Sequence, residues 1–316
     1  MRIGLIDVDS HNFPNLPLMK LSAWHKQKGD TVEWYEPLFH SMGDPFDKVY
    51  MSKIFSFTPD YPYYVNAGEV IMGGSGYCVL FIDGKEIFDK SKDIELPHEI
   101  ETIYPDYEIY YEKIPEVRNT AYGFLTRGCP RGCDFCHVKD KEGRCSIKVA
   151  DLNTFWIGQK NIVLLDPNIT ACMDWKELFQ QLIDSKAWID FSQGLDIRMM
   201  TEEKAEMIKR MKIKQMHFAW DRYEDKELIV PKLKMFQELT AWCRQKMTVY
   251  VLCNFNTTFE QDLDRIYTLR DLGYSPYVML YDKEHIPSGH RLRKLQRWVC
   301  SRNIFRTCDR FENYHT

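Results

Sequence analysis

The stretch AYGFLTRGCPRGCDFCH, residues 121–137, places three cysteines directly after a predicted strand. Cys129, Cys133 and Cys136 have the spacing Cys-x3-Cys-x2-Cys. Thiolates on short loops of this kind hold iron–sulfur clusters. Three thiolates leave one iron of a four-iron cluster without a protein ligand. An open coordination position of this kind is typical of a metal site that does chemistry rather than support structure.

The other residues of this loop suit a bulky ligand. Gly128 and Gly132 allow the backbone to turn tightly around it, because glycine accepts dihedral angles closed to other residues. Pro130 stiffens the loop. Phe135 lies between the last two cysteines, and we expect its ring to shield one face of the ligand from water.

Zinc is the competing interpretation of the loop. A structural zinc site has four ligands, usually supplied as two pairs. His137 or Cys145 would have to provide the fourth ligand here. The triplet spacing is awkward for this arrangement, and no second Cys-x2-Cys pair occurs downstream. The other seven cysteines are scattered, and we interpret them mainly as small buried apolar residues.

The chain around and after the loop has a regular rhythm of strands and helices. Six strand candidates alternate with helical stretches, which predicts a parallel sheet curled as a barrel or part of one. Two helices are expected to begin at capping boxes, Asp174 with Glu177 and Thr258 with Gln261. Pro231 suits the first turn of a third helix. The strand candidates are residues 121–126, 161–165, 188–192, 215–219, 248–253 and 276–281.

Polar residues gather where these strands end. In a barrel of this kind the chemistry lies at the C-terminal ends of the strands. The same residue types also form helix caps and turns, and this alternative stays open for each of them. The candidates are Asp166, Asn168, Gln193, Asp196, Arg198, Asp221, Asn254 and Asp282.

The first third of the chain predicts a smaller α/β layer structure. A strand at residues 3–8, a helix at 16–28 ended by Gly29 and a strand at 31–35 form a βαβ unit. Two more strands are expected at residues 48–54 and 69–72. The Pro-rich, charged stretch at 96–117 is interpreted as a connection.

The three cysteines, with Phe135 before the last of them and six β–α units, resemble the radical S-adenosylmethionine (radical SAM) superfamily. The resemblance covers about residues 118–285. It implies a [4Fe–4S] cluster whose open iron binds the amino and carboxylate groups of S-adenosylmethionine. It further implies reductive cleavage to a 5′-deoxyadenosyl radical that abstracts hydrogen from a substrate. A reductant such as flavodoxin or ferredoxin would supply the electron. The substrate, a small molecule, a peptide or a nucleic acid, stays open.

The resemblance also implies roles for residues that bind S-adenosylmethionine. The segment LLDPN, residues 164–168, stands where the family often has a Gly-Gly-Glu-like segment, so the methionine amine would fall to Asp166 or Asn168. QGLDIR, residues 193–198, is similar to the third-strand segment of members with a cobalamin-binding domain. Arg198 in that segment would pair with the methionine carboxylate.

Two further positions follow from the same resemblance. Asp221 would reach the ribose hydroxyls, and Asn254, in the fifth-strand segment VLCNF, would lie near the adenine. The first domain resembles the Rossmann-like domain of cobalamin-dependent members, especially in EVIMGGSGY at residues 69–77. The usual Asp-x-His-x-x-Gly motif is missing, although Asp9 and His11 follow the first strand. Cobalamin is therefore not expected.

The expected organisation is α/β throughout: a Rossmann-like domain at residues 1–117, a partial (β/α)6 radical SAM barrel at 118–285 and a helical extension at 286–316. The tail from residue 290 has seven Lys or Arg against two acids, interleaved with aromatics. This pattern is typical either of nucleic-acid binding or of an amphipathic helix that buries Leu292, Leu295 and Trp298. A zinc-containing nucleic-acid-binding module that uses the tail is the alternative function.

Composition sets the remaining expectations. The net charge of −4 gives no general attraction to nucleic acid or anionic membranes. No apolar run approaches the length of a membrane span, and the N-terminus does not resemble a signal peptide. We therefore expect a cytoplasmic enzyme with no membrane partner.

Overall fold

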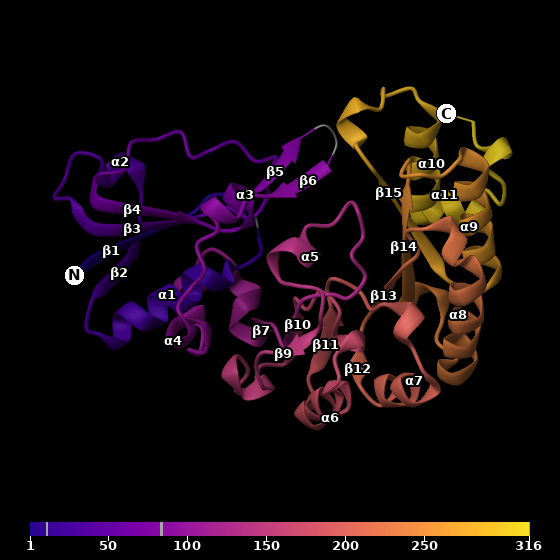
Figure 1. Cartoon of the computed structure of the whole chain (residues 1–316), viewed down its shortest axis with the longest axis horizontal. Coiled ribbons are helices and arrows are strands. Elements are labelled where there is room, and N and C mark those ends of the chain that lie inside the picture. Colours follow the sequence, from indigo (N-terminus) through magenta and orange to yellow (C-terminus); the bar gives the residue numbers. More distant parts are fainter. Residues whose placement is uncertain (11, 83–84, 316) are drawn as a thin grey trace. The chain divides into compact units, whose positions relative to one another are not determined.

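The computed structural model describes residues 1–10, 12–82 and 85–315 of the 316-residue chain. The chain forms two compact units, Met1–Val163 and Leu164–Thr316. Both combine parallel-strand sheets with helices, which confirms the α/β class (Figure 1). The partial six-stranded barrel and the expected domain boundaries after residues 117 and 285 stay predictions.

A parallel four-stranded sheet forms the first part of unit 1. Its strands are β1 (Arg2–Asp7), β2 (Thr31–Trp34), β3 (Phe46–Ser52) and β4 (Ala67–Gly73), in the order β2-β1-β3-β4. Helix α1 (Leu16–Gln27) connects β1 to β2, which confirms the predicted βαβ unit. Alternate residues of β1 point to opposite faces, so Ile3 and Leu5 pack in one apolar cluster with Leu18, while Ile6 packs in another.

The remaining elements of unit 1 are short. In segment 96–117, Tyr110 is buried and its hydroxyl donates to Asp7 at 2.5 Å, so this stretch is packed against β1. β5 and β6 pair in an antiparallel manner, as do β8 and β9, and neither pair was predicted. The elements are α2 (Pro37–His40), α3 (Ser75–Cys78), β5 (Val79–Ile82), β6 (Lys85–Phe88), α4 (His98–Glu101), β7 (Thr120–Gly123), β8 (Thr126–Arg127), α5 (Val138–Lys141), β9 (Ile147–Lys148) and β10 (Asn161–Leu164).

Unit 2 contains two groups of parallel strands. β13, β14 and β15 form a three-stranded sheet, and β11 pairs with β12. A single bridge, from Leu195 to Phe218, joins the segment after β11 to β13. The elements are α6 (Trp175–Ser185), β11 (Trp188–Phe191), α7 (Glu202–Lys209), β12 (Lys212–Ile213), β13 (Met216–Ala219), α8 (Lys226–Thr240), β14 (Met247–Cys253), α9 (Phe259–Asp271), β15 (Ser275–Leu280), α10 (Arg291–Cys300) and α11 (Arg302–Thr307).

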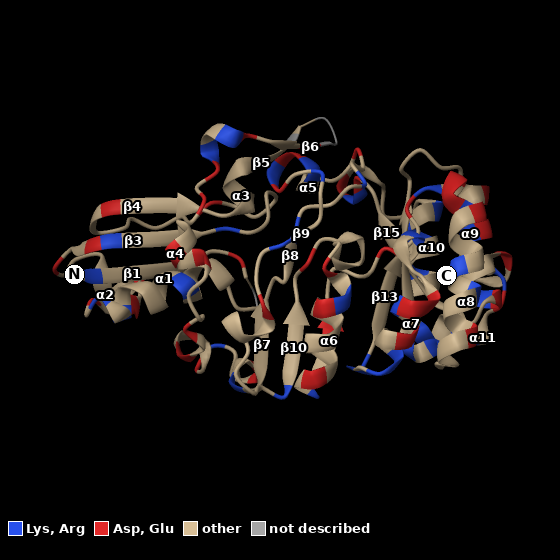
Figure 2. Ribbon diagram, turned by 60° about the horizontal axis from the view of Figure 1, so that its bottom comes forward, with Lys and Arg blue, Asp and Glu red and all other residues tan. Residues whose placement is uncertain are grey.

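All six strand candidates after residue 120 are therefore confirmed as strands, the first of them divided into β7 and β8. The short β12 was missed. In Figure 2 strands β10 and β13 are free of charged residues, whereas α6 carries both signs on its ribbon. This division follows from burial, because the strand residues Ile162, Leu164, Met216 and Phe218 are almost wholly inaccessible to water.

The predicted helix starts have mixed outcomes. Thr258 and Gln261 form the expected capping box at α9. The helix predicted to open at Asp174 is confirmed as α6, but the Asp174 side chain makes no capping hydrogen bond, so the predicted capping box was wrong. Pro231 lies inside α8 rather than in its first turn, since the helix begins at Lys226. Burial of Ile229, Leu233 and Phe236 on one face of α8 favours the longer helix despite the proline.

The basic tail forms the expected amphipathic helix. Leu292, Leu295 and Trp298 of α10 are buried. The helix packs along β15, where Gln296 donates to the Val278 carbonyl at 3.0 Å. Within the ranges that the structure describes, no helix has the length and apolar character needed to cross a membrane.

Candidate functional site

The cysteine loop is closed at its base by a short antiparallel pair. Thr126 and Arg127 of β8 lie opposite Lys148 and Ile147 of β9. Glu142 links its own segment to the start of the loop. Its two carboxylate oxygens accept hydrogen bonds from Arg127 at 3.0 Å and from the Gly128 amide at 3.1 Å. The amide of Cys129 donates to the Gly143 carbonyl at 3.1 Å. The loop is thus fixed where the first cysteine begins.

Gly128 is required at this position. Its φ of +82° lies in the left-handed region, and a Cβ atom there would come within 2.2 Å of the Cys145 carbonyl oxygen. Gly132 also has a positive φ, +59°. The prediction that these two glycines allow tight turns is confirmed.

The three thiols influence one another. Burial raises the pKa of Cys136 to about 11, and the neighbouring Cys133, Glu86 and Cys129 act in the same direction. The amide of Cys136 donates to the Cys133 carbonyl at 3.1 Å. Phe135, expected to shield the ligand, is half-buried in the same loop. The loop therefore brings its cysteines into one electrostatic neighbourhood.

The donor set of the loop suits a thiolate-ligated cluster. Among the described residues, no group of three or more His, Cys, Asp or Glu side chains is arranged to hold a metal ion. All ten cysteines lie within the described ranges, and none forms a disulfide there. The three thiols of the loop fit the expected cluster by their chemistry.

Helix α5, which follows the third cysteine, is held in unit 1 by polar contacts. Lys141 donates to the buried thiol of Cys78 at 3.2 Å and to Asp93 at 2.8 Å. His137 Nδ1 lies 2.7 Å from Glu86 Oε2. Of the two residues considered as a fourth zinc ligand, His137 is therefore paired with a carboxylate, and Cys145 is exposed.

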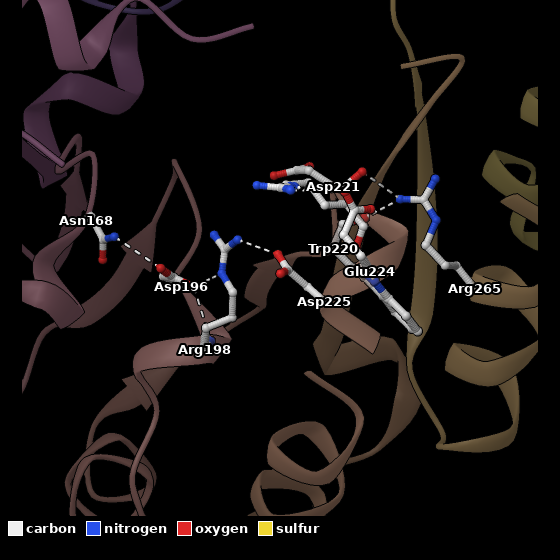
Figure 3. Close-up of polar contacts among 9 residues, drawn as sticks. Asn168, Asp196, Arg198, Trp220, Asp221, Glu224, Asp225 and Arg265 are labelled. Carbon is white, nitrogen blue, oxygen red and sulfur yellow. Dashed lines mark hydrogen bonds and ion pairs between the residues drawn. The ribbon is translucent and has the colours of Figure 1, made fainter. Parts of the chain in front are cut away.

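The predicted residues Asn168, Asp196 and Arg198 meet in unit 2 (Figure 3). Asn168 Nδ2 donates to Asp196 Oδ2 at 3.3 Å, and Asp196 Oδ1 accepts from Arg198 Nε at 2.7 Å. Arg198 also donates from Nη1 to Asp225 at 2.8 Å. These carboxylates raise the pKa of Arg198 although burial opposes them. Asp196 additionally caps the backbone amide of residue 198, so it is both a cap and a site residue.

Asp221 follows β13 directly after Trp220 and interacts electrostatically with Arg198. Burial raises the pKa of Asp221 to about 6, while Arg198 and Arg265 act against this rise. Arg265, which is inaccessible to water, donates to the backbone carbonyls of Trp220 at 2.6 Å and Asp221 at 3.0 Å. It thereby fixes the backbone that carries Asp221 (Figure 3).

The remaining predicted residues of unit 2 differ in their exposure and in their hydrogen-bond partners. Gln193 is exposed in the turn after β11, and Asp166 is buried after β10. Asn254 adopts a φ of +67° and donates to the Tyr281 carbonyl at 3.1 Å, as a turn former does. Asp282 lies 2.6 Å from His285, both near the end of β15.

The first domain's acidic pair has structural partners. Asp9 is buried and accepts from the amides of Ile54 and Phe55, each at 2.8 Å. Asp7 accepts from Tyr110 and from the Ser10 amide. His11, considered as a cobalamin ligand, lies outside the described residues.

Two residues of the site were missed from the sequence. Asp225 stands in the charged run 222–227, which resembles a solvated surface. Arg265 could have been identified from the sequence. It falls on the buried face of α9 with Ile266 and Leu269, three residues after Asp262. A comparison with protein-family models finds no match for this chain, and a comparison with curated proteins finds none either.

Proposed function

We propose that this chain is a radical SAM enzyme in which Cys129, Cys133 and Cys136 hold a [4Fe–4S] cluster and S-adenosylmethionine is cleaved reductively. The observation that carries the proposal is the Cys-x3-Cys-x2-Cys loop, whose base is closed by β8 and β9. When bound, the cluster supplies the electron that breaks the sulfonium bond, after reduction by a protein such as flavodoxin or ferredoxin.

The loop contributes ligands and shape. Because burial raises the pKa of Cys136, this thiol holds its proton at neutral pH, and metal binding must release that proton. Glu142 keeps Arg127 and the Gly128 amide in place beside the first cysteine. The loop is thus anchored at its base, beside the first of the three proposed ligands.

We propose that the contacting residues Asn168, Asp196, Arg198 and Asp225, called the polar cluster of unit 2, bind the positively charged groups of S-adenosylmethionine. Arg198 already contacts two carboxylates, Asp196 and Asp225, so the cluster as a whole is acidic. This charge favours the amino group and the sulfonium over the carboxylate. We therefore place the amino group near Asn168 and Asp196, and keep ribose binding by Asp221 as the expectation from the family.

Metal content after anaerobic reconstitution with iron and sulfide tests the proposal. The wild type should take up about four irons per chain. Cys133→Ala should lose most of this iron, whereas Cys145→Ala, an exposed cysteine of the same loop, should retain it.

Stoichiometric zinc with no iron uptake would instead support the zinc-containing nucleic-acid-binding module. Arg293, a basic residue of the tail that this module would use, is engaged within the chain, because it donates to the carbonyls of Lys283 and Ile286. Substrate identity stays open among a small molecule, a peptide and a nucleic acid.

A further inference from the structure

Unit 2 carries a row of polar and aromatic side chains that the proposed cluster chemistry does not use. The row comprises Asp190 on β11, His217 on β13, Tyr250 on β14 and Tyr277 on β15. We call these four residues the inner row. Figure 1 shows helices α8 and α9 beside one face of β13, β14 and β15.

The inner row points away from these helices. Successive side chains of a strand point to opposite faces. Phe218 packs against Phe236 of α8, with ring centroids 5.0 Å apart, so its neighbour His217 points the other way. Phe191 packs against Phe179 of α6 at 6.2 Å, which places Asp190 on the opposite face of β11.

The four side chains form one continuous set. The rings of His217 and Tyr250 are stacked, 5.3 Å apart and only 7° from parallel. Tyr277 meets Tyr250 edge to face at 5.7 Å and is 46% exposed. Asp190 interacts electrostatically with both His217 and Tyr250. The row therefore runs from a half-buried carboxylate to an accessible aromatic ring.

Two atoms of the row lack the partners that buried polar atoms normally have. Asp190 Oδ1 and His217 Nδ1 are shielded from water and have no hydrogen-bond partner within the described residues. Buried polar groups are usually satisfied, so such a pair calls for an explanation. Burial raises the pKa of Asp190, and His217 and the exposed Lys214 only partly oppose it.

Both atoms are assigned as acceptors. Burial lowers the pKa of His217, so the ring is neutral at neutral pH, and the Phe191 backbone accepts a hydrogen bond from it. Since Nδ1 is the unpartnered nitrogen, we assign the proton to Nε2, which leaves a lone pair on Nδ1. A carboxylate and an imidazole that influence each other electrostatically thus each hold an acceptor atom without a donor among the described residues.

We propose that the inner row binds a guanidinium group of a ligand, which donates to Asp190 and His217 and stacks on the tyrosine rings. A guanidinium is planar, carries several N–H donors in one plane and stacks on aromatic faces. An alkylammonium provides a point charge without this planar geometry. Guanidinium binding by the inner row requires no metal, so it can be measured without a cluster on the cysteine loop.

Isothermal titration of the full chain with agmatine, in the absence of iron, tests this inference. Agmatine should bind, and Asp190→Asn should weaken the binding about 10- to 100-fold, as expected for loss of a charged hydrogen-bond acceptor. Asp184→Asn, an exposed carboxylate on α6 that accepts from Gln180, is the matched control and should bind as the wild type does.

Tyr277→Leu provides a second variant that leaves the core intact, because this ring is partly exposed. It should weaken agmatine binding several-fold. The inference is overturned if agmatine does not bind, if Asp190→Asn binds it equally well, or if butylamine binds as tightly as agmatine. Each of these results leaves the proposed cluster chemistry unaffected, because the titration contains no iron or S-adenosylmethionine.

Discussion

Replacement of Arg265 by methionine should loosen the sheet edge that carries Asp221. The guanidinium is inaccessible to water and donates to Asp262 at 2.5 Å and to the carbonyls of Trp220, Asp221 and Leu252. Arg265→Met keeps the apolar stem but leaves the buried Asp262 carboxylate uncompensated, which costs about 3–5 kcal/mol. The carbonyls that lose a donor add about 1 kcal/mol or more.

The expected loss is therefore at least about 4 kcal/mol in the free energy of opening of this sheet. Hydrogen exchange with mass spectrometry measures it locally, on peptides that contain β13 and β14. The measurement is local so that it reports on this sheet and not on the other compact unit of the chain. Arg222→Met is the matched control, since Arg222 pairs with Glu224 at an exposed position and should cost at most about 1 kcal/mol.

A double variant separates the two contributions. Asp262 Oδ2 and Arg265 Nε have no hydrogen-bond partners within the described residues, so the ion pair is imperfectly satisfied. Arg265→Met with Asp262→Leu removes the uncompensated charge and should recover most of the loss, though not the part due to the carbonyls. The reasoning is refuted if Arg265→Met changes exchange no more than Arg222→Met does.

Three shorter predictions follow from other contacts. Gly128→Ala should sharply reduce iron uptake because an added Cβ would meet the Cys145 carbonyl oxygen. Gly143→Ala shares the strain of a positive φ, +96°, but its added Cβ would have no atom within 4 Å, so it should retain more iron, and equal uptake would contradict this. The pKa of Asp221 rises from 3.8 to about 6, so the folded chain binds more protons than the unfolded chain between these values. Stability should therefore fall as pH rises from about 4 to about 6, and Asp221→Asn should flatten this slope in melting temperatures; an unchanged slope would disprove the assignment. Lys141→Met should speed hydrogen exchange in α5, because Cys78 and Asp93 lose the hydrogen bonds that Lys141 donates. Lys139→Met is the control, and an equal effect of this variant would show that the Lys141 contacts do not hold α5.

The strands could be predicted because each is a short apolar run bounded by turn residues. β14, for example, combines the buried Val249, Val251 and Cys253. The two-residue strands β8, β9 and β12 were not identifiable as separate strands because they are too short to show a period. Their pairing depends on contacts between distant residues, which a local pattern does not contain.

The candidate site could be predicted only in part. Asp196 and Arg198 were identifiable from their position after a strand, and the structure joins them. Asp225 was not identifiable, because the sequence does not indicate which arginine a carboxylate in a charged run will contact. Asn254 satisfied the same positional rule but serves a turn, which shows that position after a strand does not distinguish a binding residue from a structural one.

The central claim is best tested by the product of S-adenosylmethionine cleavage. The protein is reconstituted anaerobically with iron and sulfide, reduced with dithionite and mixed with S-adenosylmethionine, and 5′-deoxyadenosine is measured by mass spectrometry. The account predicts 5′-deoxyadenosine from the wild type and from Cys145→Ala, and none above background from Cys133→Ala. Absence of 5′-deoxyadenosine from a wild-type protein that has taken up its iron would contradict the account.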